Sequence, residues 1–471
     1  MAENTLQFRA LLLVNEQRNA YGLRSNDYER YRKHCANRTH RLRSSLKMTH
    51  GKGREFKKLP PVKPENIKDG YLQLLLFEAE RAWAYSRELT ALAASDADKT
   101  SALKRNATSR FRRAVNWATK LLSHCQALFA TSRLSAEGLV QATAYTLILN
   151  GRFLSNRYEY DDALVQLGVA RSLLDELANR AVTSRDQALA TAFADEIGPE
   201  IRYCAHELGH SKAYDVDGIV SEVATKQKNE IVVGYDALVN KLVQESAGGA
   251  EAERKKLKPV IWDGEPVPTR NPELVDVLLR VQHAEENLQE AHGEKQTEEA
   301  GKKKERVGKA TKSKRGVAAY DAILLALSEA EDVARKLVEA QQLTTGTTAS
   351  PAGTRDIQFV HAYIIYQLLS RRIQRDLLLI TTLIHQSQTV HHAHRPHTSP
   401  LKKKGKTTTT PSWAQAAQQV QVDARLFPAI VKLLDTIIQS LNQMRTLSVV
   451  DDSPDLASAV EVRVAFTKAR R

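Results

Sequence analysis

Helical periodicity runs through nearly the whole sequence and constrains the fold more than any other feature. Between breaks that contain Pro or Gly, the residues Ala, Leu, Glu, Gln and Arg dominate, and apolar residues recur at three- and four-residue steps. No stretch alternates apolar and polar residues between hairpin turns, as a half-buried strand would. The chain is therefore predicted to be all-α.

The breaks divide the chain into a series of predicted helices. They cover residues 26–48, 68–94, 101–130, 134–156, 160–180, 183–210, 214–246, 272–292, 317–342, 355–390, 413–446 and 455–470. The segment 144–177 is typical of one helical hairpin of the tetratricopeptide kind, with Gly151 allowing the close approach of two helices and Ala163, Leu167 and Ala170 at their crossing. Because no regular repeat of this length recurs elsewhere, a tetratricopeptide-like helical array is predicted, followed by further helical hairpins.

Changes in composition predict the domain organisation. Residues 1–20 are expected to be a flexible N-terminal lead or a short amphipathic helix, residues 21–212 an RNA-binding domain for the reasons given below, and residues 213–471 a helical-repeat region. Segments rich in breakers or charge and poor in large apolar residues predict disordered loops in the last region. These insertions are expected near 245–272, 292–316, 342–355 and 385–412.

Neither cysteines nor apolar runs indicate an exported or membrane-spanning chain. Cys35, Cys125 and Cys204 lie far apart and form no paired motif, so we expect no structural disulfides and a reducing compartment. The N-terminal apolar run is too short for the core of a signal peptide. No stretch approaches the roughly 18 uncharged residues of a bilayer-spanning helix, so no membrane insertion is expected.

Positive charge is concentrated in two N-terminal segments. The formal charge of the 471 residues is +14. Residues 24–58 hold twelve Lys or Arg and three acids, and residues 99–120 hold seven and none, so the two segments together carry +16 and the remainder about −2. This uneven distribution favours an anionic polymer as partner over a general effect on solubility.

The segment 100–122, TSALKRNATSRFRRAVNWATKLL, holds six cations and no carboxylate. A solvated helix face usually mixes both signs, because opposite charges four residues apart stabilise each other. On a helix, one apolar stripe is formed by Leu103, Ala107, Phe111, Ala114, Ala118 and Leu121. Arg105, Arg112, Arg113 and Lys120 then lie on the opposite side, with Arg110 at the edge of the stripe and Lys104 nearer to it. This basic side of the helix is either a surface that binds a partner or an ordinary solvated face.

Four tracts resemble a known family. They are NAYGLRSNDYERYRKHCANRTHRLRSSL (19–46), LLFEAERAWAYSREL (75–89), the basic helix at 104–122 and GPEIRYCAHELG (198–209). Their order and spacing resemble the N-terminal RNA-binding domain of the sixty-eight-kilodalton subunit of the signal recognition particle. A weaker similarity continues through QFVHAYIIYQLLS (358–370) toward the C-terminus.

The resemblance implies a function and partners. It implies an RNA-binding scaffold subunit, not an enzyme and without a cofactor, that binds and shapes the particle RNA near a helical junction and supports co-translational targeting of secretory proteins to the endoplasmic reticulum. Expected partners are the particle RNA, the ribosome as part of the particle, and the seventy-two-kilodalton subunit. Family members continue into a C-terminal region that pairs with that subunit. Since the sequence stops at Arg471, the site that pairs with the seventy-two-kilodalton subunit is expected to be missing or truncated. A cytoplasmic location is implied, with nuclear or nucleolar assembly and peripheral association with the endoplasmic reticulum.

The family also contains an arginine-rich helix that enters an RNA groove, and its position matches Lys104, Arg105, Arg110, Arg112 and Arg113. Regular A-form RNA has a major groove too deep and narrow for side chains, so a helix can enter only where a bulge or internal loop widens it. Arginine suits such a place because its planar fork grips phosphate at two points and stacks on unpaired bases.

The candidate RNA-binding residues come from both basic segments. They are Lys104, Arg105, Arg110, Arg112, Arg113, Lys120, Arg24, Arg30, Arg32, Lys33, Arg38, Arg41, Arg43, Lys47, Lys52, Arg54 and Lys57. Tyr28 and Tyr31 interleave with arginines and would permit stacking on bases. The favoured reading places both tyrosines in the core, because residues three apart share a helix face.

Two other functions remain open. His206-Glu207-Leu208-Gly209-His210 fits HExxH, in which two histidines one turn apart bind Zn²⁺ and the glutamate activates water, so a zinc-dependent metallohydrolase is the first alternative. The extended pattern HExxHxxGxxH fails, since Ala213 and Val216 replace its Gly and last His. No catalytic or metal-binding residues are therefore assigned, and these residues are expected to form a structural helix. A helical protein-binding scaffold without RNA is the second alternative.

Overall fold

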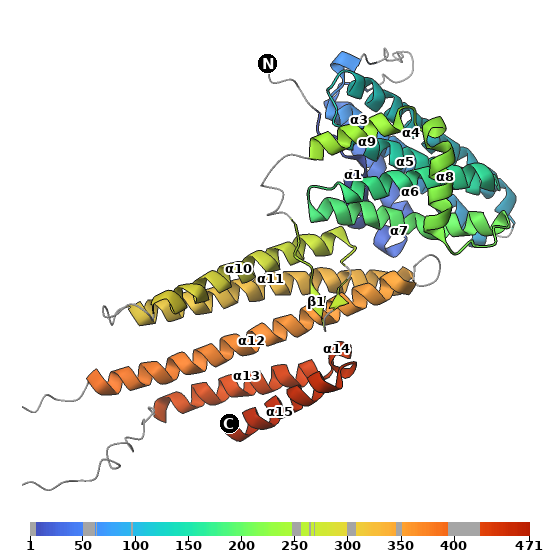
Figure 1. Ribbon diagram of the computed structural model, residues 1–471. Coiled ribbons are helices and arrows are strands. Elements are labelled where there is room, and N and C mark those ends of the chain that lie inside the picture. Colours follow the sequence, from blue (N-terminus) through green and yellow to red (C-terminus); the bar gives the residue numbers. More distant parts are fainter. Residues whose placement is uncertain are drawn as a thin grey trace, which may run out of the picture. The chain divides into compact units, whose positions relative to one another are not determined.

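Figure 1 shows a computed structural model of the chain, which describes residues 6–49, 62, 64–95, 98–246, 256–262, 265–267, 269–298, 308–344, 351–393 and 424–471. The helices are α1 (Ala10–Ala20), α2 (Tyr28–Ser45), α3 (Asp69–Ser95), α4 (Thr100–Ala130), α5 (Ala136–Ser155), α6 (Tyr160–Asn179), α7 (Ser184–Glu207), α8 (Val216–Ile231), α9 (Tyr235–Ser246), α10 (Pro272–Glu298), α11 (Gly308–Thr344), α12 (Pro351–Ala393), α13 (Phe427–Arg445), α14 (Ser448–Asp451) and α15 (Pro454–Arg470). The all-α prediction is confirmed. One short ladder is the exception, in which β1 (Ile261–Trp262) pairs antiparallel with β2 (Glu265–Pro266).

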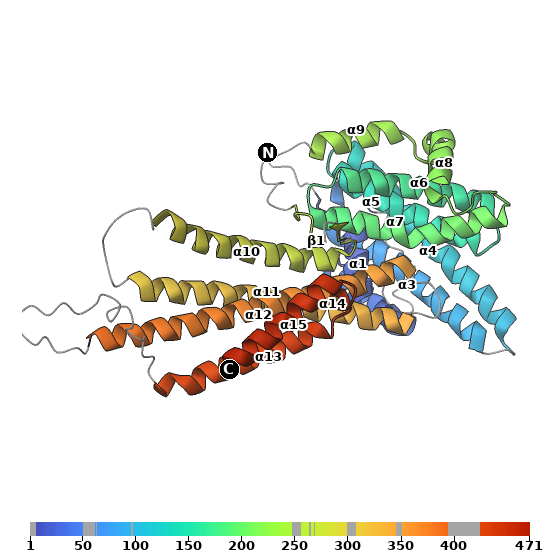
Figure 2. The ribbon, with the colours of Figure 1, turned by 60° about the horizontal axis from the view of Figure 1, so that its bottom comes forward.

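The chain divides into two compact units, residues 1–276 with 337–354 and residues 277–336 with 355–471. In the first unit each long helix packs mainly on its neighbours in the sequence. Helix α3 packs against α2 and α4, α5 against α4 and α6, and α6 against α7 and α8 (Figure 2). Short connections between successive helices favour this antiparallel stacking. The result is the helical array that the sequence predicts.

The hairpin of α5 and α6 confirms the predicted crossing. A Cβ atom added at Gly151 would lie 2.7 Å from Cγ of Leu167, closer than carbon atoms can approach without a shift. Ala163, Leu167 and Ala170 are fully buried. Glycine therefore sets the distance between the two helices.

Of the two expectations for residues 1–20, helix α1 fits the short amphipathic helix, and residues 1–5 lie outside the described residues. Leu6 forms a parallel bridge with Leu134, and helix α1 buries Leu11 and Val14 completely in the first core. The Leu11 backbone N–H donates to Oε1 of Gln141 at 3.2 Å. Because these apolar side chains have the spacing of a helix stripe, burial offsets the entropy of ordering the segment.

The first unit also continues beyond the boundary expected near residue 212. The predicted helix 214–246 is interrupted between α8 and α9, where Gly234 adopts a φ of +74° that favours glycine. Val220 of α8 and Leu238 of α9 belong to the same core as α1–α7. The pattern of apolar residues continued across the break, so periodicity alone gave one helix instead of two.

Helices or strands occupy parts of all four segments that were expected to be disordered insertions. Helices α10 and α11 extend into 292–316, and α11 and α12 extend into 342–355. Helix α12 also runs to Ala393, inside 385–412, while β1 and β2 lie inside 245–272. Lys, Glu, Gln and Ala are good helix formers, so charged ends continue a helix that the apolar pattern no longer marks. Residues 247–255, 263–264, 268, 299–307, 345–350 and 394–412 of these insertions lie outside the described residues.

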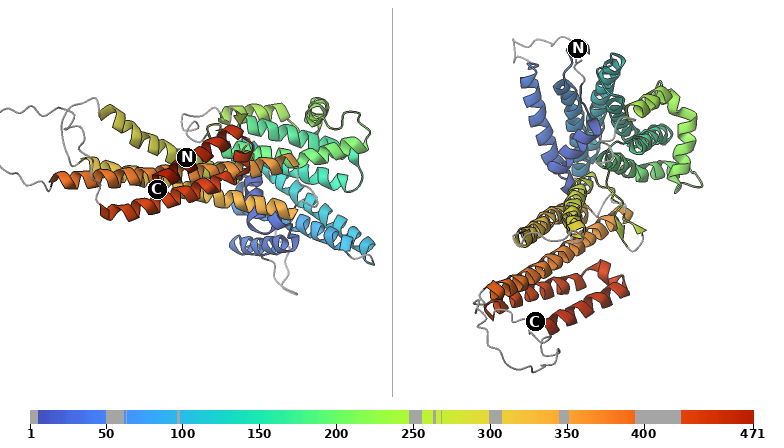
Figure 3. Two further views of the ribbon diagram at one scale, coloured as in Figure 1. Left: turned by 90° about the horizontal axis from the view of Figure 1, so that it is seen from below. Right: turned by 60° about the vertical axis from the view of Figure 1, so that its left-hand side comes forward.

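In the second unit, α12, α13 and α15 share an apolar core. It contains Leu369, Ile380, Leu434, Ile437, Leu441 and Val460, and α13 lies beside α15 (Figure 3). Buried Asp376 accepts hydrogen bonds from Nη2 of Arg375 and Oγ1 of Thr436, both at 2.9 Å. Among the described helices, none is long and apolar enough to cross a membrane.

Candidate nucleic-acid interface

Helix α4 places its apolar and basic residues on separate faces, as its sequence predicts. The buried stripe contains Ala107, Phe111, Ala114, Ala118 and Leu121, and Leu103 is half-buried. The ring of Phe111 meets that of Phe153 on α5 edge to face, with centroids 5.6 Å apart. This stripe fixes the rotation of α4 and so fixes which side chains point to solvent.

The basic residues of α4 are exposed and electrostatically unbalanced. Lys104, Arg105, Arg110, Arg112, Arg113 and Lys120 are all exposed. The 31 residues of the helix include no Asp or Glu. Within the part of the chain that the structure describes, none of the six cations forms an ion pair. Their mutual repulsion is relieved only by water, salt or an anionic partner.

Aromatic rings contact two of these cations. The guanidinium carbon of Arg110 lies 5.0 Å from the ring centroid of Tyr85 on α3. Nζ of Lys120 lies 5.0 Å from the ring of Trp117. A cation over an aromatic face keeps its full charge, so these contacts position the side chains without neutralising them.

In contrast, the fold neutralises several candidate residues of the first basic segment. Arg32 pairs with Glu88 at 2.5 Å, Arg43 with Glu78 at 2.6 Å, and Lys33 with Glu29 at 2.6 Å. Arg24 also pairs with Glu273. Nη2 of Arg38 donates to Gln73 at 3.3 Å. The four ion pairs reduce the free positive charge that the sequence count suggested, whereas neutral Gln73 leaves the charge of Arg38 in place.

The other candidates of this segment divide into two groups. Arg30, Arg41 and Lys47 are exposed, and no ion pair joins them to the residues that the structure describes. Lys52, Arg54 and Lys57 lie outside the described residues. Helix α2 therefore contributes a weaker basic surface than α4.

The tyrosines of α2 pack toward the core. Tyr31 is fully buried, and its hydroxyl donates to Oε2 of Glu80 at 2.7 Å. Tyr28 is half-buried, and its ring meets that of Trp83 at 6.0 Å, edge to face. The core reading is confirmed for Tyr31, which has no free face on which a base could stack.

Sequence reasoning missed the contribution of α3 to this surface. Tyr85 is half-buried beside Arg110, and the guanidinium carbon of Arg87 lies 5.7 Å from the ring of Tyr28. The tract 75–89 drew attention only as part of a family resemblance. Its pairing of tyrosine with arginine off the apolar stripe was the available signal.

The HELGH segment does not place its histidines on one helix face. Helix α7 ends at Glu207, and Gly209 has a φ of +76°. The His210 N–H closes the end of the helix by donating to the Ala205 carbonyl at 3.0 Å. The His206 side chain is 79% exposed. The hydrogen bond of His210 and the left-handed Gly209 make this segment a helix end. No group of three potential metal ligands occurs among the described residues.

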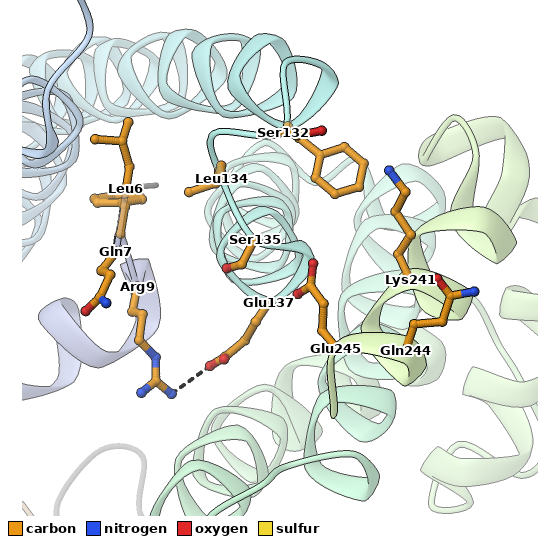
Figure 4. A pocket seen from close by; sticks show the side chains of 12 residues that line it. Leu6, Gln7, Arg9, Ser132, Leu134, Ser135, Glu137, Lys241, Gln244 and Glu245 are labelled. Atoms are coloured by element: carbon orange, nitrogen blue, oxygen red, sulfur yellow. Dashed lines mark ion pairs between the residues drawn. The ribbon is translucent and has the colours of Figure 1, made fainter. Parts of the chain in front are cut away.

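A cavity of about 650 Å³ lies elsewhere in the first unit (Figure 4). Its polar groups already hold the fold together. Nη2 of Arg9 pairs with Glu137 at 2.7 Å, and the Glu245 carboxylate accepts the Ala136 N–H at the start of α5 at 2.9 Å. Nζ of Lys241 lies 4.4 Å from the ring of Phe129. None of the candidate RNA-binding residues lines this cavity.

The fold and this surface define a class of protein, a helical array in which one helix presents an unbalanced basic face. Such a face is suited to binding an anionic polymer. The family profile described as RNA-binding signal recognition particle 68 (SRP68) matches residues 23–471. The chain therefore belongs to the SRP68 family.

Individual relatives agree with this assignment. Signal recognition particle subunit SRP68 of Drosophila melanogaster is 24% identical over 471 residues, which cover 98% of this chain and 67% of the relative. The subunits of the same name from Dictyostelium discoideum and Caenorhabditis elegans are 28% and 26% identical, over 41% and 54% of this chain and 31% and 40% of their own lengths. The chain thus spans two thirds or less of these relatives.

A solved structure is also similar. It is titled as the SRP68-RBD from Chaetomium thermophilum and covers 42% of this chain and 90% of its own, with 22% sequence identity and a TM-score of 0.35.

Proposed function

We propose that this chain is a non-enzymatic RNA-binding scaffold subunit of the signal recognition particle, whose helix α4 binds the particle RNA near a helical junction. The observation that supports it is the exposed basic face of α4, which has six cations on a helix without any carboxylate. Membership of the SRP68 family supports the choice of RNA over other polyanions.

The proposed contact uses the shape of α4. Arg112 and Arg113 project away from the stripe around Phe111 that anchors the helix in the core. A helix held in this way can enter a widened RNA groove with its backbone already ordered, so binding does not have to fold it. Arginines then contact phosphates on both sides of the groove and stack on unpaired bases.

A scaffold role follows from this rigidity. A preorganised helix in a junction stabilises the RNA conformation whose groove is open, and thereby shapes the RNA without chemical change. Bound to the particle, the chain would support targeting of ribosomes that carry secretory chains to the endoplasmic reticulum. We include nucleolar assembly and pairing with the seventy-two-kilodalton subunit in this proposal, and co-elution with that subunit tests whether residues 1–471 suffice for pairing.

Competitive filter binding tests the RNA function. The full chain is titrated with particle RNA at two salt concentrations, with transfer RNA as competitor. We expect particle RNA to bind in preference to transfer RNA at both concentrations, with weaker affinity at the higher salt. Equal affinity for both RNAs, or none, would contradict the proposal and favour a helical scaffold that binds only protein.

A further inference from the structure

The ring of Tyr85 on α3 contacts guanidinium groups from the two neighbouring helices. The guanidinium carbon of Arg32 on α2 lies 4.9 Å from the ring centroid, and that of Arg110 on α4 lies 5.0 Å from it. Helix α3 packs against both α2 and α4. Tyr85 is therefore a point at which the two basic segments, far apart in the sequence, meet.

The two arginines differ in charge balance. Nε and Nη2 of Arg32 lie 2.5 and 3.2 Å from the two carboxylate oxygens of Glu88, so this guanidinium is neutralised. Arg110 has no carboxylate partner among the described residues and is exposed. Two cations can approach one ring because Glu88 compensates one of them. The uncompensated positive charge beside Tyr85 is therefore that of the Arg110 guanidinium.

Simple packing does not require an aromatic residue here. Tyr85 is only half-buried, while its neighbours Ala84 and Ser86 are buried. Phe77 of α3 and Leu121 of α4 instead belong to the same buried apolar core. The distinctive property of the Tyr85 ring is its π face, which attracts a cation and limits its rotamers without removing its charge.

We infer that Tyr85 is a positioning residue for RNA binding, which holds Arg110 at the edge of the basic face so that its fork is ordered before the RNA arrives. This inference rests on the proposed function. An exposed arginine otherwise loses rotamer freedom on binding, so preordering raises affinity. The expected gain is about 2- to 5-fold, comparable to one cation–π contact at an exposed site.

Two variants of the full chain test the inference. Tyr85→Phe keeps the ring, and Tyr85→Leu keeps apolar bulk but removes the π face. Affinity for particle RNA is measured at several salt concentrations, with urea denaturation to compare stability. We expect Tyr85→Leu to weaken binding about 2- to 5-fold and Tyr85→Phe to bind like the parent. Neither variant should change the slope of affinity with salt, because no cation is removed.

A double-mutant cycle separates positioning from general packing. If Tyr85 acts through Arg110, Tyr85→Leu should cost no further affinity in an Arg110→Ala background. Full affinity of Tyr85→Leu, or the same loss in both backgrounds, would overturn the inference. Should Tyr85→Leu not fold, Tyr85→Met replaces it in the same cycle. If the parent chain itself shows no preference for particle RNA, the proposed function is contradicted instead. Failure of the inference and failure of the proposed function are therefore distinguishable.

Discussion

Arg18 on α1 holds both oxygens of the Glu80 carboxylate on α3. Its Nε lies 2.9 Å from Oε2 and its Nη2 lies 2.8 Å from Oε1. Glu80 is fully buried, and the hydroxyls of Tyr31 and Tyr145 each donate to it at 2.7 Å. One carboxylate thus joins α1, α2, α3 and α5, and its negative charge is compensated by the half-buried Arg18.

Replacing Arg18 should therefore destabilise the first unit strongly. In Arg18→Ala the Glu80 charge stays buried without its counterion, and the contact of the guanidinium with the Trp83 ring, at 4.3 Å, is also lost. We expect the free energy of unfolding to fall by about 3–5 kcal/mol. Urea denaturation followed by circular dichroism measures it, and exposed Arg105→Ala should change it by less than about 0.5 kcal/mol. A loss below about 1 kcal/mol for Arg18→Ala would contradict the burial of this ion pair.

Phe111→Ala should affect folding rather than RNA contact. The ring is 3% exposed and packs against Phe153, so its removal leaves a cavity between α4 and α5. We expect a loss of about 3–5 kcal/mol in unfolding free energy. The next residue provides the matched control, because Arg112→Ala leaves the core intact and should unfold like the parent in the same thermal scan. Equal stability of the two variants would place α4 in a different rotation.

Glu207→Gln should leave folding and RNA affinity unchanged. Glu207 stands at the end of α7, and His210 lies beyond the left-handed Gly209, so HELGH has no shared helix face for zinc. The measurements are metal content after chelator washing and hydrolysis of a fluorogenic peptide by parent and variant. One tightly held zinc per chain, together with hydrolysis that the substitution abolishes, would restore the metallohydrolase reading.

Acid should destabilise the first unit partly through His34. Burial, reinforced by Arg38 and Arg41, lowers the pKa of this imidazole below its usual value. The unfolded chain then binds the proton first as pH falls, so stability is constant above about pH 7 and decreases as pH drops below about 6.5 toward the native pKa. Urea midpoints from pH 7.5 to 5 should fall less steeply for His34→Gln. A nuclear magnetic resonance titration that gave His34 a pKa above 6.5 would reverse the expected sign.

The sequence predicted features that depend on one helix. The stripe around Phe111 and the exposure of Arg112 follow from the period of the α-helix alone. The crossing of α5 and α6 at Gly151 was also predicted, but most contacts between side chains of different helices were not predictable. Nothing local indicates that Glu88 neutralises Arg32 or that Tyr85 meets Arg110, because those contacts arise only when α2, α3 and α4 pack.

The most direct test of the central claim uses the double variant Arg112→Ala with Arg113→Ala. Its affinity for particle RNA is measured at several salt concentrations. We expect a loss of about 1–3 kcal/mol per strong contact and a flatter salt dependence, because each lost phosphate contact removes roughly one released counterion. Arg→Lys at both positions should keep much of the slope but lose affinity, since charge survives and the planar fork does not.

The matched control is Arg463→Ala with Arg470→Ala, which removes the same charge from exposed positions on α15 and should leave both affinity and slope unchanged. If the Arg112 and Arg113 variant instead binds with parental affinity and the parental slope, the basic face of α4 is a solvated surface and does not bind RNA.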